Sequence, residues 1–185
     1  MAIKTDMAKA YDRLEWQFIQ ATMTSMGFPP HLVSTIMKCI STVSYSIILN
    51  GRPSTKFIPQ RGIRQGDPLS PYLFILCANV FSALISKAQS EHIIHGVKIS
   101  SGAPEISHLL FVDDSLIFCG ATKTEATIIQ DIINTYQQTS GQYGQIRINV
   151  QQKSCSPRST RGDEPYAYAS CSCFLQILGN AYYYW

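Results

Sequence analysis

The chain has 185 residues, of which 45% are hydrophobic and 15% are charged, and its formal net charge is +3. These values are typical of one globular domain with a hydrophobic core, and they exclude a disordered or fibrous protein. The apolar run of residues 71–85 contains Asn79 and Ser82 and is shorter than the roughly 18 residues of a membrane span, so a buried helix is predicted there. Charged residues occur throughout residues 1–13 and leave no apolar central region, so no signal peptide is expected there. We therefore expect an intracellular protein without a membrane partner.

The first forty residues predict a short strand followed by two helices. After a strand-like opening at residues 3–7, residues 11–28 place apolar side chains at helical spacing, and Gly27, with two prolines after it, ends this helix. A second helix is predicted over residues 31–40, with an apolar face formed by Val33, Ile36, Met37 and Ile40.

Residues 43–60 predict a β-hairpin in a basic part of the chain. Apolar residues alternate before Asn50-Gly51, the strongest short hairpin signal, and residues 52–60 form the return strand. Between Trp16 and Gly66 there is no acidic residue, whereas five cations occur, at Lys38, Arg52, Lys56, Arg61 and Arg64. This asymmetry suits a phosphate-bearing partner, and it suits a solvated basic face without a ligand equally well.

The remaining elements complete an α+β layer fold. The Gly- and Pro-rich loop of residues 61–71 opens the buried helix, with Asp67 or Ser70 as its cap and Leu73, Leu76, Cys77, Val80 and Leu84 on its buried face. A short strand is predicted over residues 95–100, an amphipathic helix over 122–140 with Ile128, Ile132 and Tyr136 aligned, and a strand over 144–154. Separate helices and antiparallel strands indicate an α+β fold. Residues 155–185 lack steady periodicity, and no fold is expected for them.

The segment 108–120 places Asp113 and Asp114 inside an apolar run. An ordinary hairpin turn accounts for this pattern, because aspartate tolerates turn geometry. Carboxylates presented to a divalent metal account for it equally well, because such cations prefer oxygen ligands. Two ions need a further carboxylate. Asp6, at the end of the first predicted strand, is the candidate, whereas Asp12 is more simply an acid at a helix start.

Residues 4–16, 51–74 and 107–118, in this order, resemble three successive motifs of the reverse transcriptase palm of LINE-type non-LTR retrotransposons, particularly plant elements. The resemblance covers residues 1–154 as a partial palm domain and leaves 155–185 as a degenerate or poorly ordered tail. It implies an antiparallel sheet packed on helices with a ferredoxin- or RRM-like core. It also implies a truncated chain with fingers and thumb largely missing, impaired or inactive in isolation, and nuclear if the retroelement function is retained.

The activity that the resemblance implies is the addition of dNTPs to the 3′-hydroxyl of a DNA primer on an RNA template, by two-metal phosphoryl transfer. Asp6 and Asp113 match the acids that bridge two Mg²⁺ ions, for which Mn²⁺ is a possible substitute. Asp114 matches the second acid of the pair, which supports the site and is a metal ligand part of the time. Val112 stands where these elements most often have alanine, and we expect it to be tolerated as a β-compatible residue.

Five further residues match nucleotide- or template-binding positions of that family. Tyr11 matches an aromatic that closes on the sugar, and a core-packing aromatic at a helix start is the alternative. Arg64, Gln65 and Gly66 match a loop that contacts the incoming nucleotide and the template. Lys153 matches a lysine thought to protonate pyrophosphate, and a plain exposed lysine is the alternative.

Two functions other than polymerisation remain open at this point. The chain could be a non-catalytic nucleic-acid-binding relic or adopted module, holding RNA through its basic segment. It could also be an unrelated metal-dependent phosphotransfer domain with a palm-like fold, such as a nucleotide cyclase, although the loop of residues 61–71 would then have no role. The sequence does not determine the oligomeric state.

Overall fold

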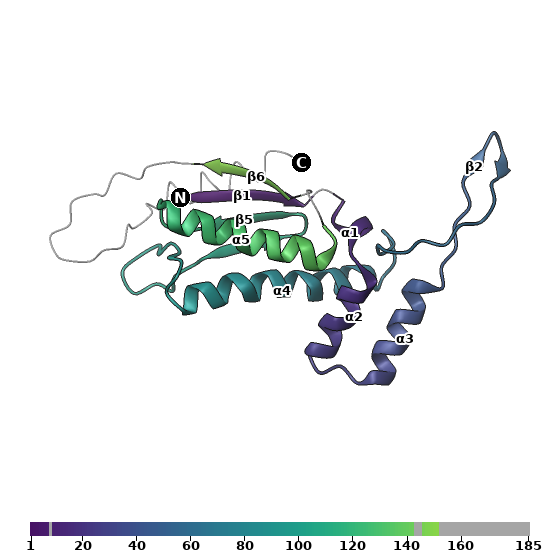
Figure 1. Ribbon diagram of the computed structural model, residues 1–185, viewed down its shortest axis with the longest axis horizontal. Coiled ribbons are helices and arrows are strands. Elements are labelled where there is room, and N and C mark those ends of the chain that lie inside the picture. The colour runs from purple at the N-terminus through teal and green to yellow at the C-terminus, as the bar shows by residue number, and fades with distance from the viewer. Residues whose placement is uncertain (8, 143–145, 152–185) are drawn as a thin grey trace.

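The computed structural model describes residues 1–7, 9–142 and 146–151, so Lys153 and the predicted tail lie outside the described residues. Figure 1 shows a sheet covered by long helices, with a helix pair and a hairpin beside them. The elements are, in chain order, β1 (Ala2–Met7), α1 (Ala10–Arg13), α2 (Trp16–Ser25), α3 (Pro30–Ser41), β2 (Ile48–Leu49), β3 (Arg52–Pro53), α4 (Ser70–Ser90), β4 (His108–Phe111), β5 (Asp114–Phe118), α5 (Lys123–Ser140) and β6 (Ile146–Gln151).

The sheet is antiparallel, with strand order β4-β5-β1-β6, and α4 and α5 lie along one of its faces (Figure 1). Side chains alternate between the two faces of a strand, so every second residue of β1 and β5 points toward the helices. These are buried, and they include Ile3, Thr5, Met7, Ser115 and Ile117. This arrangement confirms the predicted α+β fold with an antiparallel sheet packed on helices.

The core lies between the sheet and the two long helices. Its centre is Tyr136 of α5, whose ring lies 5.0 Å from that of Phe81 in α4 and 5.9 Å, edge-on, from that of Phe18 in α2. All three elements therefore meet at one aromatic cluster. Aromatic pairs in this geometry add about 0.5–1.5 kcal/mol each beyond the area they bury.

The predicted helix of residues 11–28 is broken into α1 and α2. Leu14 and Glu15 adopt extended ψ angles of 122° and 131°, so the helical path stops between the two elements. The backbone N–H of Glu15 donates instead to Ser140 O at the end of α5, 3.0 Å away, and Trp16 Nε1 donates to Gly62 O at 2.7 Å. Contacts with distant segments thus replace the helical hydrogen bonds that the local spacing predicted.

The buried faces of α4 and α5 are rotated from the predicted ones. In α5, Ile129, Ile133 and Tyr136 are buried, whereas Ile128 and Ile132 are only partly so. In α4 the buried face includes Phe74, Phe81 and Ile85 beside the predicted Leu73 and Cys77, while Leu76, Val80 and Leu84 are partly buried. Apolar residues border both faces, so periodicity alone could not choose between neighbouring stripes.

Helix α4 is long and apolar enough, by length and composition, to cross a membrane. It nevertheless packs against α2, α5 and β4, and it supplies fully buried side chains to the core, among them Leu73, Phe81 and Ile85. The buried core helix that its sequence predicted is therefore present and extends over 21 residues.

The predicted strand of residues 95–100 is reduced to bridge positions at Val97 and Lys98, of which Val97 pairs with Ile106. The backbone N–H of His95 donates to the Glu125 carboxylate at 3.0 Å, and that of Gly96 donates to the Glu105 carboxylate. Because these donors are engaged by side chains, they are not available for a ladder with a neighbouring strand.

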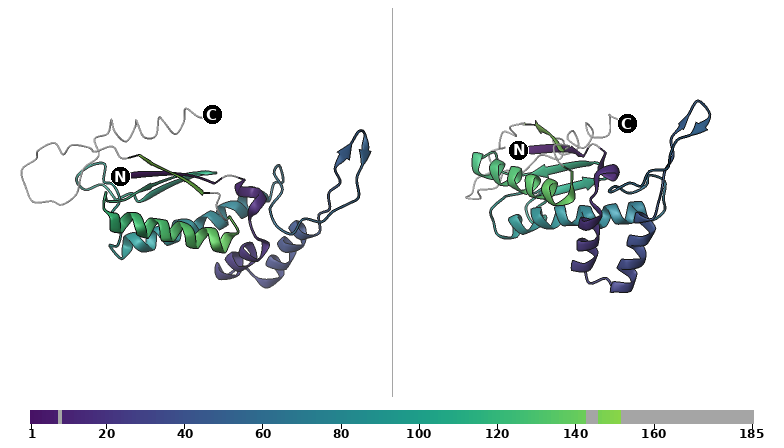
Figure 2. Two further views of the ribbon diagram at one scale, coloured as in Figure 1. Left: turned by 45° about the horizontal axis from the view of Figure 1, so that its top comes forward. Right: turned by 45° about the vertical axis from the view of Figure 1, so that its right-hand side comes forward.

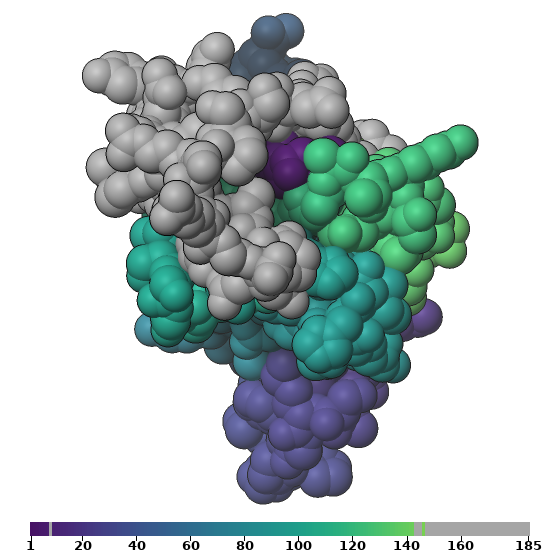
Figure 3. Space-filling model, turned by 90° about the vertical axis from the view of Figure 1, so that its left-hand side faces the viewer, coloured from purple at the N-terminus to yellow at the C-terminus, as the bar shows by residue number. Residues whose placement is uncertain are grey.

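The predicted hairpin is present, but its strands β2 and β3 have only two residues each, with one further bridge between Tyr45 and Phe57. It projects away from the body of the molecule (Figure 2). Asn50 and Gly51 have φ angles of 51° and 76°, as the turn of a two-residue hairpin requires. Ile48 and Leu49 are 72% and 64% exposed. In Figure 3, α2 and α3 extend as a second projection below α4 and α5.

Candidate active site

The two predicted acid segments meet at one end of the sheet. Asp6 in β1 lies directly opposite Asp114 in β5, so both side chains stand on the sheet face opposite the helices. Cross-strand partners in antiparallel sheets have Cα atoms about 4.5–5.5 Å apart. Asp113 lies in the adjoining turn between β4 and β5, and its carbonyl accepts a 2.8 Å hydrogen bond from Met7 N at the end of β1.

The ionisation of Asp113 is affected by both neighbouring acids. Burial of its carboxyl raises its pKa above the ordinary value, and the charges of Asp6 and Asp114 raise it further. Like charges at close range disfavour ionisation in this way, and a bound cation would favour the ionised carboxylates again. The structure therefore brings the three acids singled out by sequence together at one end of the sheet.

The turn that carries Asp113 is tight. Phe111 and Asp114 are paired across the hairpin, which leaves only Val112 and Asp113 to reverse the chain. Val112 has a φ of 48°. The expectation that valine sits here in a β conformation is wrong, because a two-residue connection needs a left-handed residue, and for β-branched residues such a φ is a strained outlier.

Replacing Val112 with asparagine should stabilise the protein by about 1 kcal/mol, because asparagine tolerates the left-handed region. Val112 is 49% exposed, so little buried apolar area is lost. The measurement is the free energy of unfolding from urea titration. Val112→Ile is the matched control, since it keeps the β-branched carbon and should bring no gain. Equal stability for the two variants would contradict the strain at Val112.

Tyr11 lies in α1 beside the acids. Its ring stacks on that of Phe74 in α4, with centroids 4.9 Å apart and planes 14° from parallel. Burial raises the pKa of its hydroxyl, and the charge of Asp113 raises it further, which places the phenol near the acid cluster. The packing predicted for a helix-start aromatic is present, and the proximity to Asp113 is compatible with the nucleotide-contacting position that the resemblance implied.

The loop of residues 61–66 lies along α1. Ile63 N donates to Tyr11 O at 2.9 Å and Gly62 N to Leu14 O at 2.8 Å. Gly62 has a φ of 85°, and a Cβ there would lie 2.6 Å from the carbonyl oxygen of Asp12, so this close approach requires glycine.

Two of the three predicted nucleotide-contacting residues of this loop, Arg64 and Gln65, line a cavity of about 400 Å³. Asp12, Arg61 and Asp67 contribute further polar side chains to its wall. Gly66 follows with a φ of 85°. Asp67 also organises the start of α4, since its carboxylate accepts a 2.8 Å hydrogen bond from Leu69 N, although Leu69 rather than Asp67 or Ser70 is the N-cap.

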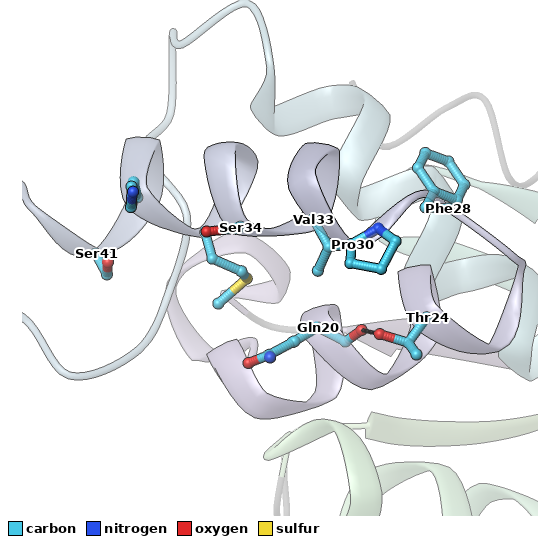
Figure 4. Close-up of a pocket in the computed structure, with 9 residues that line it drawn as sticks. Gln20, Thr24, Phe28, Pro30, Val33, Ser34 and Ser41 are labelled. Atoms are coloured by element: carbon cyan, nitrogen blue, oxygen red, sulfur yellow. Dashed lines mark hydrogen bonds between the residues drawn. The ribbon is translucent and has the colours of Figure 1, made fainter.

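A second cavity, of about 340 Å³, separates α2 from α3 (Figure 4). Its wall combines apolar side chains such as Phe28 and Val33 with Gln20, Thr24 and Lys38. Lys38, one of the five cations between Trp16 and Gly66, therefore lies in the wall of this cavity. Another, Arg61, lies 3.5 Å from the Glu15 carboxylate and so has an acidic partner among the described residues.

Sequence reasoning missed two charged residues that matter for the sheet. Lys4 Nζ lies 3.2 Å from Asp114 Oδ2. Because side chains alternate between the two faces of a strand, the sequence alone could have placed Lys4 on the same face as Asp6, two residues later. Glu125 accepts hydrogen bonds from His95 N at 3.0 Å and Gly120 N at 2.7 Å. A glutamate three residues after Thr122 is a helix-start signal that could have identified it.

The three acids offer oxygen ligands to a metal, and their spacing and chemistry decide whether one fits. Among residues 1–7, 9–142 and 146–151, no group of three or more acidic, histidine or cysteine side chains converges closely enough to hold an ion as it stands. The donor set of three carboxylates nevertheless has the hard oxygen atoms that Mg²⁺ and Mn²⁺ prefer. Burial and the charges of Asp6 and Asp114 all raise the pKa of Asp113, and a bound cation would oppose this effect by favouring the ionised carboxylate. The residues fit a divalent cation by chemistry.

Comparison with known proteins gives one family. Residues 1–155 match the family described as reverse transcriptase (RNA-dependent DNA polymerase). An uncharacterized mitochondrial protein of Arabidopsis thaliana is 53% identical over 68 residues, which are 37% of this chain and 56% of that protein. A retrovirus-related Pol polyprotein from type-1 retrotransposable element R2 of Popillia japonica is 30% identical over 115 residues, 62% of this chain and 18% of the polyprotein.

A retrovirus-related Pol polyprotein from a type-2 R2 element of Drosophila melanogaster is 33% identical over 113 residues, 61% of this chain and 10% of the polyprotein. The chain thus spans little more than half of the mitochondrial protein and less than a fifth of either polyprotein. Among solved structures, apo telomerase from Candida tropicalis, truncated from its C-terminal domain, aligns with a TM-score of 0.55 over 86% of this chain and 32% of that one. At 18% identity this likeness concerns the fold, which is that of a polymerase palm.

Proposed function

The chain belongs to the reverse transcriptase (RNA-dependent DNA polymerase) family, and on this premise we propose that it adds deoxynucleotides to a primer 3′-hydroxyl on an RNA template. Its relatives among Pol polyproteins of R2 elements place its reverse transcriptase domain with those of non-LTR retrotransposons. Reverse transcriptases generally use divalent metal ions and act on a template and a primer. For this chain, residues 1–154 would form the palm, and an active retroelement protein would work in the nucleus.

The observation that carries the proposal is the clustering of three acids from two distant segments. Asp6 and Asp114 are cross-strand partners, and both raise the pKa of Asp113. Neighbouring carboxylates repel one another when ionised, and a bound cation would stabilise their charged forms, so the cluster indicates a cation-dependent site. An ordinary hairpin turn would account for Asp113 and Asp114 alone but leaves the third acid unexplained.

We assign the residues separate roles within this proposal. Asp6 and Asp113 would hold two Mg²⁺ or Mn²⁺ ions, and Asp114 would support them electrostatically. The ions would activate the primer hydroxyl and neutralise the leaving pyrophosphate. Tyr11, held by Phe74, would contact the sugar of the incoming nucleotide, and Arg64 with Gln65 would contact nucleotide and template from the adjacent cavity wall.

The deciding experiment is primer extension with purified chain, a DNA primer on an RNA template, dNTPs and either Mg²⁺ or Mn²⁺. The same reaction is repeated with the flanking segments of an R2 Pol polyprotein supplied in trans. We expect template-dependent incorporation that disappears when the metal is chelated. Absence of extension in both reactions would reject the polymerase proposal.

A second candidate, an adopted nucleic-acid-binding module, is favoured by one observation. The segment between Trp16 and Gly66 carries five cations and no acid, and it forms both projections from the body of the molecule. This candidate predicts RNA binding that weakens steeply with salt and survives Asp6→Asn, Asp113→Asn and Asp114→Asn combined. Such binding without extension would favour the module over the polymerase.

A further inference from the structure

We propose that Lys4 is the charge-compensating residue of the acid cluster and positions it by acting through Asp114. The inference rests on the proposed function, since it concerns the cations that the acids would hold. Lys4 Nζ and Asp114 Oδ2 are 3.2 Å apart. Neither the family match nor the sequence patterns assign Lys4 a role.

The geometry of the sheet dictates this pairing. Lys4 precedes Asp6 by two residues in β1, so the two side chains stand on the same face of the strand. Asp114 lies opposite Asp6, whereas Leu116 lies opposite Lys4. The Lys4 side chain therefore reaches diagonally across the strand pair to the acid, a contact that long side chains in antiparallel sheets can make.

The environment makes the contact more than a solvated surface pair. The Lys4 and Asp114 side chains are 21% and 31% exposed, which is much less than the 72% and 50% of the surface pair Lys87–Glu91. Charges that are partly removed from water interact more strongly and are screened less by salt. Lys4 contacts Asp114, one of the two acids whose charges add to the effect of burial on Asp113, so its positive charge offsets part of the repulsion within the cluster.

Two consequences follow for the cation site. With no metal bound, Lys4 supplies positive charge to the cluster and keeps one oxygen of Asp114 engaged. With a metal bound, the same ammonium competes with the ion for that oxygen. Asp114 is then left as a supporting acid, while Asp6 and Asp113 remain for the ions. The charge of Lys4 thus weakens metal binding while it stabilises the metal-free sheet.

The test uses the full chain and Mn²⁺ as the probe, with affinity measured by electron paramagnetic resonance in the absence of nucleic acid. Lys4→Met removes the charge and keeps an unbranched side chain. It should tighten Mn²⁺ binding about tenfold, because the ion no longer competes with the Lys4 ammonium, 3.2 Å from Asp114 Oδ2, for the negative charge of Asp114. Lys4→Arg should bind as the original chain does. Lys87→Met is the matched control, because it removes a lysine that is also ion-paired but lies away from the acids.

A purely structural role for Lys4 predicts unchanged or weaker Mn²⁺ binding by Lys4→Met, and that result would overturn the proposal. Action through Asp114 is tested by repeating the substitution in an Asp114→Asn background, where the gain in affinity should fall below threefold. A full tenfold gain there would show that Lys4 acts independently of Asp114.

Urea unfolding without metal separates this proposal from the proposed function. Lys4→Met should lower the unfolding midpoint, and Asp114→Asn should restore much of it, because the unpaired acid is removed together with its partner. Additive effects would overturn the role of Lys4 even if Mn²⁺ binds. Non-additive effects in a chain that binds no Mn²⁺ would instead reject the metal-dependent function and leave the Lys4–Asp114 coupling standing.

Discussion

Asp113→Asn is expected to abolish primer extension and, at the same time, to stabilise the metal-free chain. Asparagine keeps the shape of the side chain but neither binds a divalent cation well nor carries charge, so extension should fall by on the order of 10³-fold or more. The gain in stability follows from the acids that surround Asp113, since burial, Asp6 and Asp114 all disfavour its ionised form.

The pH dependence of that gain has a definite sign. The folded-state pKa of Asp113 is raised, so the folded chain binds the proton more tightly than the unfolded chain. Stability is therefore lost as pH rises from the ordinary value of 3.8 through the raised pKa, and the full penalty is present at neutral pH. Asp113→Asn should raise the urea midpoint at pH 7, and the difference should shrink toward pH 3.

The control for Asp113→Asn is Asp131→Asn, which neutralises an exposed acid on α5. It should leave both extension and the midpoint nearly unchanged. A metal-free Asp113→Asn variant less stable than the original chain would contradict the charge repulsion at the site, and undiminished extension would contradict the catalytic assignment. Unfolding therefore tests the charge repulsion at Asp113, and primer extension tests its catalytic role.

Glu125→Gln is expected to cost the fold about 3 kcal/mol, because it replaces a buried, hydrogen-bonded carboxylate. Glu125 is 8% exposed and joins three segments, receiving backbone N–H groups from His95 and Gly120 while it lies in the first turn of α5. His95 Nδ1 lies 3.3 Å from its other oxygen. Both backbone N–H groups donate to the same oxygen, so glutamine keeps an acceptor for them only by turning its NH₂ toward His95 Nδ1, and it loses the negative charge that strengthens these contacts.

The loss caused by Glu125→Gln should depend on pH. Burial tends to raise the pKa of Glu125, but hydrogen bonds from the His95 and Gly120 backbones, together with the His95 side chain, outweigh burial and hold the pKa below 4.5. The stabilisation by the ionised group is therefore present above pH 4.5 and disappears as pH falls through the lowered folded-state pKa. Urea titrations at pH 7 and near pH 3 measure this change.

Glu91→Gln is the comparison for Glu125→Gln. Glu91 is half-exposed and faces Lys87 at 3.9 Å, one turn away on the helix, so its loss should cost less than about 0.5 kcal/mol. An equal cost for the two glutamates, or a cost at Glu125 that does not change with pH, would contradict the buried hydrogen-bond network.

Features encoded locally were predictable from the sequence. Asn50-Gly51 specifies its own backbone conformation, so the hairpin and its turn were found. The helices over residues 30–41 and 123–140 were predicted close to their observed bounds, because their apolar periodicity is sustained. The acids were grouped through the place of Asp6 at a predicted strand end and through the order and spacing of three motifs, since nothing local links Asp6 to residues more than 100 positions away.

Features imposed by distant contacts were not predictable. The break before α2 depends on Ser140 and Gly62, which lie far along the chain from Glu15 and Trp16. The left-handed φ of Val112 depends on the pairing of Phe111 with Asp114, which leaves two residues for the turn. Lys4 carried a readable signal in its spacing from Asp6, but its partner is known only once the register of β1 and β5 is fixed.

The central position of β1 has a consequence for folding kinetics. Its two partners, β5 and β6, begin at residues 114 and 146, so every hydrogen bond to β1 in the sheet closes a loop of more than 100 residues. Such closures are entropically expensive and slow, whereas the helices can form from local contacts. During synthesis, Asp6 emerges from the ribosome long before Asp113 and Asp114. Assembly of the acid cluster should therefore be among the last events of folding, after the helical layer has formed.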